Sequence, residues 1–281
     1  MVSQARVYGL IGYPVKHSLS PAMHNAAFKA LGIDARYELF EVKPQDLNSF
    51  IKSLDKGIFG LNITIPHKEK VLDFIRLNED SGFARYIKAV NTIVRRDDQW
   101  LGFNTDVPGF LRHLKENIDP ANKKIAILGA GGAGRAVTYA IAVAKAKEID
   151  IFDIDKEKAH GLVSLLKNMF KDVNIKSVDT VAELNVWDKD ILINATPIGM
   201  KESDPCLVKE EMLHKKLFVY DVIYNPLETK LLALAKKTGT KTSNGLGMLL
   251  YQGMLSFEIW TGKKAPEEVM WQSLLSQIST K

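Results

Sequence analysis

The stretch of sequence that decides the fold is Lys123-Lys-Ile-Ala-Ile-Leu-Gly-Ala-Gly-Gly-Ala-Gly134. It begins with an apolar run, 123–128, and leads through a glycine-rich turn into a helix-like run, 135–147. A second apolar run, 148–152, ends at Asp153. The order of strand, G-x-G-x-x-G turn, helix, strand and acid is a dinucleotide-binding fingerprint.

The glycines of this turn have separate physical roles. Gly129 allows the tight turn, Gly131 lets the backbone approach a pyrophosphate, and Gly134 lets helix and strand pack closely. The start of the helix offers free N–H groups and the positive end of its dipole to phosphates. A glycine turn without a ligand is the alternative, which the surrounding strands and helix disfavour. The residues expected to contact the dinucleotide here are Gly129, Ala130, Gly131, Gly132 and Ala133.

The turn lies in the middle of a 281-residue chain, so about 120 residues before it are available for a separate substrate domain. Apolar and helix-like segments alternate on both sides of the turn, which indicates an α/β fold with a mainly parallel sheet. We expect an N-terminal α/β substrate domain, made discontinuous by the C-terminal helices, and a Rossmann-type nucleotide domain. The expected bounds are 1–106 with about 243–281 for the former and 107–242 for the latter.

Within these bounds the sequence predicts particular elements. Expected strands are 6–11, 37–42, 60–65, 123–128, 149–153, 173–178, 190–194, 217–222 and 241–242. Expected helices are 21–31, 44–54, 68–75, 106–117, 135–147, 227–238, 248–260 and 266–278. Residues 89–95 and 99–103 flank Asp97-Asp98 and read as a hairpin.

Composition and charge exclude several classes of protein. The net charge of +5 is mild and the lysines are mixed with acids, which does not resemble a nucleic-acid footprint. We see no apolar run of the ~20 residues that cross a bilayer and no signal peptide. Cys206 is the single cysteine, so an intrachain disulfide is impossible. We expect a cytoplasmic protein with a small-molecule partner, either monomer or homodimer, without nucleic-acid or membrane partners.

Polar residues interrupt the apolar pattern where a plain fold does not need them. Ser18 and Ser20 lie in a loop before a helix, where they can bind a polyol or carboxylate, or Ser20 can simply cap the helix. Thr64 ends a strand, and Lys68 follows it at the edge where open α/β sheets bind ligands. Lys68 is thus a candidate proton donor or base, with a solvated surface lysine as the alternative.

Two later segments carry further candidates. Asn91 interrupts an apolar strand, and Asp106 either caps the next helix or faces a ligand. Tyr224 follows a strand and Gln252 lies on a helix face. The six histidines lack metal-binding spacing and there is no thiolate pair, so we expect no metal. The residues suit hydride transfer between a nicotinamide cofactor and a hydroxylated substrate.

Together these segments resemble the shikimate dehydrogenase family. The motifs that carry the resemblance are Gly-x-Pro-x-x-His-Ser-x-Ser-Pro at 12–21, Asn-x-Thr-x-Pro-x-Lys at 62–68, Ala-Val-Asn-Thr at 89–92, Asn-Thr-Asp at 104–106, Gly-Ala-Gly-Gly-Ala at 129–133, Asn-Ala-Thr-Pro-x-Gly-Met at 194–200 and Gly-Leu-Gly-Met-Leu at 245–249. The resemblance implies the reversible reduction of 3-dehydroshikimate to shikimate in the chorismate pathway of aromatic amino acid biosynthesis.

The resemblance also implies roles for the candidates. Ser18, Ser20 and Tyr224 would bind the substrate carboxylate. Thr64, Asn91, Asp106 and Gln252 would hold ring hydroxyls. Lys68 and Asp106 would form the catalytic pair, with Lys68 delivering a proton as hydride reaches the C3 carbonyl carbon.

The chain departs from the family where NADP is read. The family's usual Asn-Arg-Thr after the second strand is here Asp153-Ile154-Asp155. A carboxylate at that position accepts hydrogen bonds from the ribose 2′-OH and repels a 2′-phosphate, although Lys156 and Lys158 lie nearby. We therefore predict NAD, with NADP, the family default, as the alternative. Further cofactor residues implied by the family are Asp153, Ile154, Asp155, Lys158, Thr196, Val222 and Gly245.

Three other functions remain open. A quinate/shikimate dehydrogenase using NAD is the nearest, and the retained Ser20 favours shikimate over quinate. A non-catalytic metabolite sensor need not keep both Lys68 and Asp106. A folate one-carbon dehydrogenase shares the two-domain plan but lacks the Ser-x-Ser motif.

Overall fold

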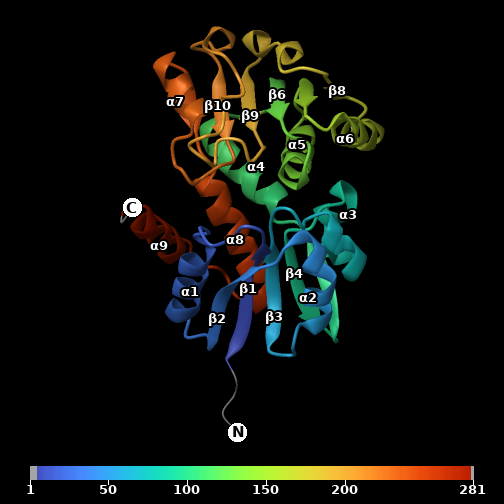
Figure 1. The fold of residues 1–281 in the computed structure, drawn as a ribbon, viewed down its shortest axis with the longest axis vertical. Helices are drawn as coiled ribbons and strands as arrows, with labels where there is room; N and C mark the ends of the chain where they lie inside the picture. Colours follow the sequence, from blue (N-terminus) through green and yellow to red (C-terminus); the bar gives the residue numbers. More distant parts are fainter. Residues whose placement is uncertain (1–4, 280–281) are drawn as a thin grey trace. The chain divides into compact units, whose positions relative to one another are not determined.

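The computed structural model describes residues 5–279, except the side chain of the last of them. It divides into two compact units, a first unit of residues up to 109 together with those from 250 on, and a second unit of residues 110–249. The chain passes between the units inside two helices, α4 (Asp106–Asn117) and α8 (Leu246–Thr261). Figure 1 shows the elements along the chain.

The first unit is built on a mixed five-stranded sheet in the order β2-β1-β3-β4-β5. Its strands are β1 (Arg6–Gly12), β2 (Ala35–Glu41), β3 (Ile58–Ile63), β4 (Thr92–Arg96) and β5 (Gln99–Phe103). The first three pair in parallel, while β3–β4 and β4–β5 are antiparallel. The predicted hairpin is therefore the antiparallel half of this sheet.

The side chains of β1 pack on both faces of this sheet, because successive residues of a strand point to opposite faces. Tyr8 stacks on Phe28 at 5.2 Å and on Trp260 of α8 at 5.1 Å between ring centroids. Its neighbour Val7 belongs to the cluster on the other face, which includes Leu47. The remaining helices of the first unit are α1 (Ser20–Ala30), α2 (Leu47–Ser53), α3 (Phe83–Ile87) and α9 (Glu267–Ser279).

The helix expected over 68–75 is not an α-helix. The structure has only a short 3-10 turn at Lys70–Phe74. The carbonyl of Lys68 accepts a hydrogen bond from the backbone N–H of Val90 at 2.8 Å, so it faces the hairpin segment. The N–H of Leu72 bonds instead to Glu69, which tightens the turn.

The second unit holds an all-parallel six-stranded sheet in the order β11-β10-β9-β6-β7-β8. The strands are β6 (Lys124–Leu128), β7 (Glu148–Phe152), β8 (Asn174–Ser177), β9 (Ile191–Asn194), β10 (Phe218–Asp221) and β11 (Lys241–Ser243). The helices between them are α5 (Gly132–Val143), α6 (Lys156–Met169) and α7 (Lys230–Lys237). This doubly wound arrangement places the end of β6 next to β7 on one side and β9 on the other.

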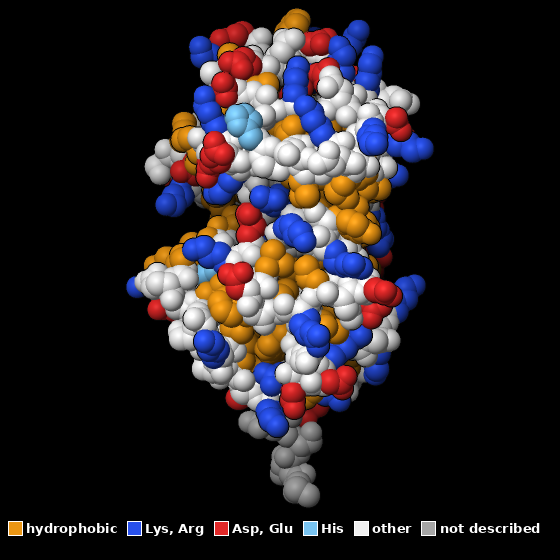
Figure 2. Space-filling model, turned by 90° about the vertical axis from the view of Figure 1, so that its right-hand side faces the viewer, with side chains coloured by type: hydrophobic (Ala, Val, Ile, Leu, Met, Phe, Trp, Pro, Cys, Tyr) orange, Lys and Arg blue, Asp and Glu red, His pale blue; other side chains and the backbone are white. Residues whose placement is uncertain are grey.

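Charged side chains of both signs are interspersed over the face drawn in Figure 2. That pattern agrees with the mild net charge of +5. Within residues 5–279, no helix combines the length and apolar character needed to cross a bilayer.

His24 is a buried titratable group in the core of the first unit. Its ring stacks on Tyr37 with centroids 4.5 Å apart, and neither ring nitrogen has a hydrogen-bond partner. Burial lowers the pKa of His24 from its ordinary value of 6.5 to about 3. The folded protein therefore binds fewer protons than the unfolded chain between these two values, and its stability falls as the pH falls through this window.

We expect the free energy of unfolding to drop by about 2 kcal/mol between pH 7.5 and pH 5 because of His24 alone. The variant His24→Phe keeps the ring stack and should lack this part of the pH dependence. His160→Gln, which changes an exposed histidine, is the matched control and should keep it. Urea unfolding of the three proteins at both pH values measures the difference. Equal pH dependence in the parent and His24→Phe would contradict the expectation.

Candidate active site and dinucleotide-binding turn

Lys68 lies in a loop after β3 that several long-range hydrogen bonds hold in place. The N–H of Thr64 donates to the carbonyl of Ile11 at 2.9 Å. The buried ring of His67 donates from Nε2 to the carbonyl of Val42 at 2.7 Å, since a carbonyl oxygen can only accept. The backbone around Lys68 is thus fixed before its side chain makes any contact.

Lys68 and Asp106 form an ion pair. Lys68 Nζ lies 2.7 Å from Asp106 Oδ2, and the two side chains are only 12% and 6% exposed. The other oxygen, Oδ1, accepts a hydrogen bond from Asn91 Nδ2 at 2.9 Å. In a site this buried, removing either charge leaves the other without its counter-ion.

Asp106 is the first residue of α4, but another residue caps that helix. Asn104 Oδ1 accepts the N–H of Val107 at 3.1 Å, which is the bond expected of a capping side chain. The carboxylate of Asp106 is therefore directed to Lys68 and Asn91. Of the two interpretations open from the sequence, capping by Asp106 is the wrong one.

Asn91 joins residues that are far apart in the sequence. Its Oδ1 accepts the N–H of Thr105 at 2.7 Å, and its Nδ2 lies 3.3 Å from Oε1 of Gln252 on α8. The structure thus brings Lys68, Asp106, Asn91 and Gln252 into one continuous polar cluster within the first unit.

A second polar layer lies against this cluster, and two of its residues, Tyr37 and Ser256, were not predicted from the sequence. Asn62 is buried; its Nδ2 donates to Ser256 Oγ at 2.9 Å, and its Oδ1 accepts the hydroxyl of Tyr37 at 2.8 Å. Thr92 Oγ1 and Ser256 Oγ lie 2.7 Å apart. Ser256 lies four residues after Gln252, so helical spacing alone places both on one face of α8.

The remaining candidates of the first unit lie at the start of α1 and directly after β3. Ser20 is buried at the start of α1, and its side chain makes no capping bond there, so simple capping does not explain it. Ser18 Oγ accepts the N–H of Ser20 at 3.2 Å. Thr64 directly follows β3. Its methyl group lies so close to Gly12 that a Cβ on Gly12 would overlap it. Tyr224 belongs to the second unit, in the turn after β10.

The glycine turn of the second unit has the geometry of a phosphate cradle. Gly129 has φ +101°, a conformation that favours glycine, and its N–H donates to the carbonyl of Phe152 at 2.7 Å. A Cβ on Gly134 would overlap the carbonyl of Gly129. Helix α5 begins at Gly132, earlier than expected, because Gly131 serves as its N-cap. The free N–H groups of this helix start fit a pyrophosphate.

Asp153 has a role that the sequence did not indicate. Its Oδ2 accepts the N–H of Ala130 at 2.6 Å, and its Oδ1 accepts the N–H of Asp155 at 2.9 Å. The carboxylate therefore fastens the glycine turn to the loop after β7. It holds the cradle in shape as well as placing negative charge beside it.

The residues after Asp153 present no unpaired lysine to a phosphate. Ile154 is 92% exposed. Asp155 caps α6 by accepting the N–H of Lys158, whose Nζ lies 3.4 Å from Asp155 Oδ2. Lys156 Nζ lies 3.2 Å from Oδ1 of Asp179. Both lysines that could have compensated for the acidic loop are paired with carboxylates.

Three further cofactor candidates lie at the carboxyl ends of neighbouring strands. Thr196 follows β9, Val222 follows β10, and Gly245 follows β11. The N–H of Val222 donates to the carbonyl of Asn194 at 2.9 Å. Because the strands are parallel, these residues lie at the same edge of the sheet as Gly129, the edge where such sheets bind ligands.

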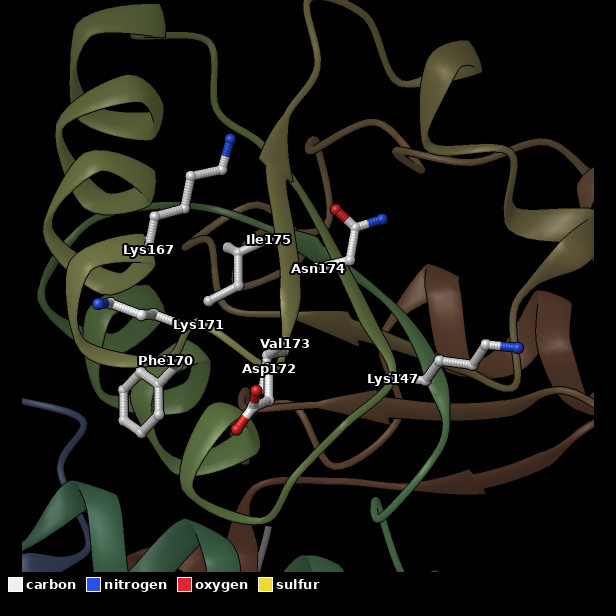
Figure 3. A pocket seen from close by; sticks show the side chains of 8 residues that line it. All are labelled: Lys147, Lys167, Phe170, Lys171, Asp172, Val173, Asn174 and Ile175. Carbon is white, nitrogen blue, oxygen red and sulfur yellow. The ribbon is translucent and has the colours of Figure 1, made fainter.

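A surface depression in the same unit is not a candidate site. It lies at the amino ends of β7 and β8, the edge of the sheet opposite the glycine turn, and Figure 3 shows its three lysines pointing apart around an aspartate. Its lining residues are Lys147, Lys167, Phe170, Lys171, Asp172, Val173, Asn174 and Ile175. Across residues 5–279, no group of three or more His, Cys, Asp or Glu side chains could hold a metal ion.

Comparison with known proteins identifies the family. The model of the "Shikimate dehydrogenase substrate binding domain" matches residues 10–93. The model of the "Shikimate 5'-dehydrogenase C-terminal domain" matches residues 245–275. A shikimate dehydrogenase (NADP+) of Methanopyrus kandleri is 44% identical over 98% of this chain and 97% of its own. The chain belongs to the shikimate dehydrogenase family.

Solved structures of the shikimate dehydrogenase family share the fold. One, a shikimate dehydrogenase in complex with NADP+, is 42% identical, with a TM-score of 0.87 over 98% of this chain and 96% of its own. Another, the shikimate 5-dehydrogenase of Listeria monocytogenes in complex with shikimate and NAD, is 35% identical, with a TM-score of 0.84 over 98% of each chain. The α/β fold and the family predicted from the sequence are thus confirmed.

Proposed function

We propose that this protein catalyses the reversible, nicotinamide-dependent reduction of 3-dehydroshikimate to shikimate. The observation that carries the proposal is the buried Lys68–Asp106 ion pair, held at 2.7 Å and joined through Asn91 to Gln252. Such a cluster combines several hydrogen-bonding groups with an ammonium group, which suits a hydroxylated ring that is reduced at a carbonyl.

In the proposed reaction, Lys68 manages the proton. A nicotinamide dinucleotide supplies the hydride, which adds to the C3 carbonyl carbon, and Nζ of Lys68 gives a proton to the carbonyl oxygen as it becomes a hydroxyl. Asp106 keeps the ammonium group in place and accepts a hydrogen bond from a neighbouring substrate hydroxyl. In the oxidative direction, Lys68 takes that proton back.

The other site residues would bind and orient the substrate. We assign the substrate carboxylate to Ser18, Ser20 and Tyr224. The ring hydroxyls are assigned to Thr64, Asn91 and Gln252. The bond between Asn91 and Gln252 supports this assignment, because it preorganises two of these three side chains before substrate arrives.

A single set of assays tests the proposed function. Initial rates are measured with shikimate and with quinate, each with NAD and with NADP. We expect shikimate to be the better substrate, since Ser20 is present. Faster turnover of quinate would favour the quinate/shikimate alternative, and no turnover of either compound would favour a non-catalytic metabolite-binding protein.

We further propose that NAD is the preferred cofactor, although the Methanopyrus relative is named for NADP+. Two carboxylates, Asp153 and Asp155, lie in the loop that meets the adenosine ribose, and Lys156 and Lys158 are each paired with an acid. A 2′-phosphate there would meet negative charge without an unpaired lysine to offset it. The relative from Listeria monocytogenes was solved in complex with shikimate and NAD, so the family has a member with NAD bound.

The expected result is a higher kcat/KM with NAD than with NADP. The double variant Ile154→Arg with Asp155→Thr adds a cation and removes an acid, so it should shift the ratio toward NADP by about tenfold or more. Ile154→Ala is the control, which changes the same position without adding charge. Asp153 is left intact because it fastens Ala130. A tenfold or greater preference of the parent for NADP would refute the proposal.

A further inference from the structure

Asp221 is a buried carboxylate that the proposed reaction does not use. It ends β10, its side chain is fully buried, and it accepts three hydrogen bonds. The donors are Thr229 Oγ1 at 2.7 Å, Asn194 Nδ2 at 3.1 Å and the N–H of Ile223 at 3.1 Å. Burial raises the pKa of Asp221 above its ordinary value, against the lowering effect of these donors. Burying a carboxylate costs free energy, which its hydrogen bonds must offset. The segments that donate these three hydrogen bonds therefore indicate what Asp221 does.

Asn194 connects Asp221 to the loop after β9. Its Nδ2 also donates to the carbonyl of Ile198 at 3.1 Å. Its Oδ1 accepts both the N–H of Thr196 at 3.1 Å and the hydroxyl of Thr196 at 2.7 Å. Every polar atom of the Asn194 side chain is thus used, and the 195–198 turn is closed around it.

Thr229 ties the same carboxylate to the start of α7. Its hydroxyl caps this helix by accepting the N–H of Leu232 at 3.3 Å while donating to Asp221. A Cβ built on Gly199 would lie 3.4 Å from Cβ of Thr229 and 3.3 Å from Cδ1 of Ile223. The 195–199 loop is therefore packed against both the turn after β10 and the cap of α7.

The position of this network in the sheet indicates its role. Strand order runs β10-β9-β6-β7, and the glycine turn lies at the end of β6 with Asp153 at the end of β7. A dinucleotide whose ribose meets Asp153 and whose pyrophosphate meets the glycine turn must extend its nicotinamide half toward β9 and β10. Thr196 and Val222 lie there, on the two loops that Asp221 joins.

We propose that Asp221, acting through Asn194 and Thr229, positions the 195–199 and 222–224 loops for the nicotinamide half of the dinucleotide. The inference rests on the proposed function only in that the protein binds a nicotinamide dinucleotide. Asp221 makes no contact with the cofactor itself in this proposal; it is a positioning residue. Its loss should affect the nicotinamide half of the ligand and spare the adenosine half.

The test compares a whole dinucleotide with its adenosine half. Dissociation constants for NAD and for ADP are measured by calorimetry; if the parent favours NADP, the pair is NADP and 2′-phosphoadenosine 5′-diphosphate. The variants are Asp221→Asn, which replaces an acceptor oxygen by a donor, and Thr229→Val, which removes the hydroxyl. Thr229→Ser restores it, and Thr238→Val removes a hydroxyl at the other end of α7 as a matched control.

We expect Asp221→Asn and Thr229→Val to weaken dinucleotide binding by about tenfold or more, with ADP binding within about twofold of the parent. Thr229→Ser should recover most of the loss, and Thr238→Val should show none. Thermal unfolding shows which variants are folded, and Thr229→Val answers the question if Asp221→Asn does not fold.

Two outcomes would overturn the proposal. Equal weakening of NAD and ADP would mean that the network only maintains the fold of the second unit. Unchanged binding of both ligands would mean that the loops hold their shape without it. A parent that binds NAD but turns over no shikimate would instead contradict the proposed function, and the comparison of NAD with ADP would still decide the role of Asp221.

Discussion

Replacing Lys68 by alanine should lower turnover of shikimate by about 10² to 10⁴-fold and change the shikimate dissociation constant by less than about threefold. This range is the usual contribution of a positioned acid or base to a proton-transfer step. The substrate contacts assigned to Asn91 and Gln252 remain in the variant, so binding should persist while the proton has no donor. Steady-state rates and equilibrium binding of shikimate measure the two quantities.

A second lysine provides the control for that experiment. Lys70, two residues after Lys68, begins the 3-10 turn and is exposed. Lys70→Ala therefore changes the same net charge close by without touching the buried pair, and it should keep a near-normal rate. A near-normal rate for Lys68→Ala would contradict the assignment of Lys68 as the proton donor. A large loss of shikimate binding with little loss of kcat would make Lys68 a substrate ligand only.

The structure also predicts how Lys68→Ala affects stability. Asp106, whose side chain is 6% exposed beside Lys68, keeps its bond from Asn91 but loses the Lys68 ammonium at 2.7 Å. Breaking one side of a buried pair costs about 3–5 kcal/mol when the remaining charge is uncompensated. The double variant Lys68→Ala with Asp106→Asn should recover part of that loss, which separates the effect on folding from the effect on turnover.

Local sequence signals predicted the strands of the second unit, although the helix α6 was missed. The strand, glycine turn and helix from Lys124 to Val143 form a short-range pattern whose residues fix one another's conformation. Strands that are buried on both faces appear as apolar runs, and strands that alternate with helices pair in parallel. For these reasons the parallel sheet and its carboxyl edge were predictable.

Specific hydrogen bonds, two of the three long-range, explain what the sequence could not predict. The carbonyl of Lys68 accepts the N–H of Val90, so this segment does not form the expected α-helix. Asn104 caps α4, so Asp106 does not. Asp153 binds the N–H of Ala130, 23 residues earlier in the chain. Each outcome depends on which of several equally capable polar groups happens to be nearest in the folded chain, and residue type does not reveal that.

The candidate site shows the same division. Sequence pattern could place Lys68 and Asp106 each at the edge of an element, but their 2.7 Å contact depends on how β3, β4 and β5 pair. The family resemblance, rather than the pattern, suggested that they act together. The layer beneath them, with Tyr37 and Ser256, was invisible because each residue is ordinary in its own segment.

Replacing Gly131 by alanine should weaken dinucleotide binding by about 10- to 100-fold and leave the free energy of unfolding within about 1 kcal/mol of the parent. Gly131 has φ −71° and ψ −169°, which any residue adopts, and a Cβ built on it has no protein atom within 4 Å. The substitution therefore disturbs nothing in the protein itself. Only a ligand that approaches the backbone at this point would meet the new methyl group.

Gly161→Ala in α6 is the matched control, since a Cβ there also has no neighbour within 4 Å. It should leave dinucleotide binding unchanged and stabilise the helix by about 1 kcal/mol or less. Gly134→Ala cannot replace Gly131→Ala in this test, because its Cβ would overlap the carbonyl of Gly129 and would disturb the fold and the site together. Calorimetric binding and thermal unfolding of the two alanine variants give the comparison. Undiminished binding by Gly131→Ala would place the pyrophosphate away from this turn, because only contact with a ligand links that methyl group to affinity.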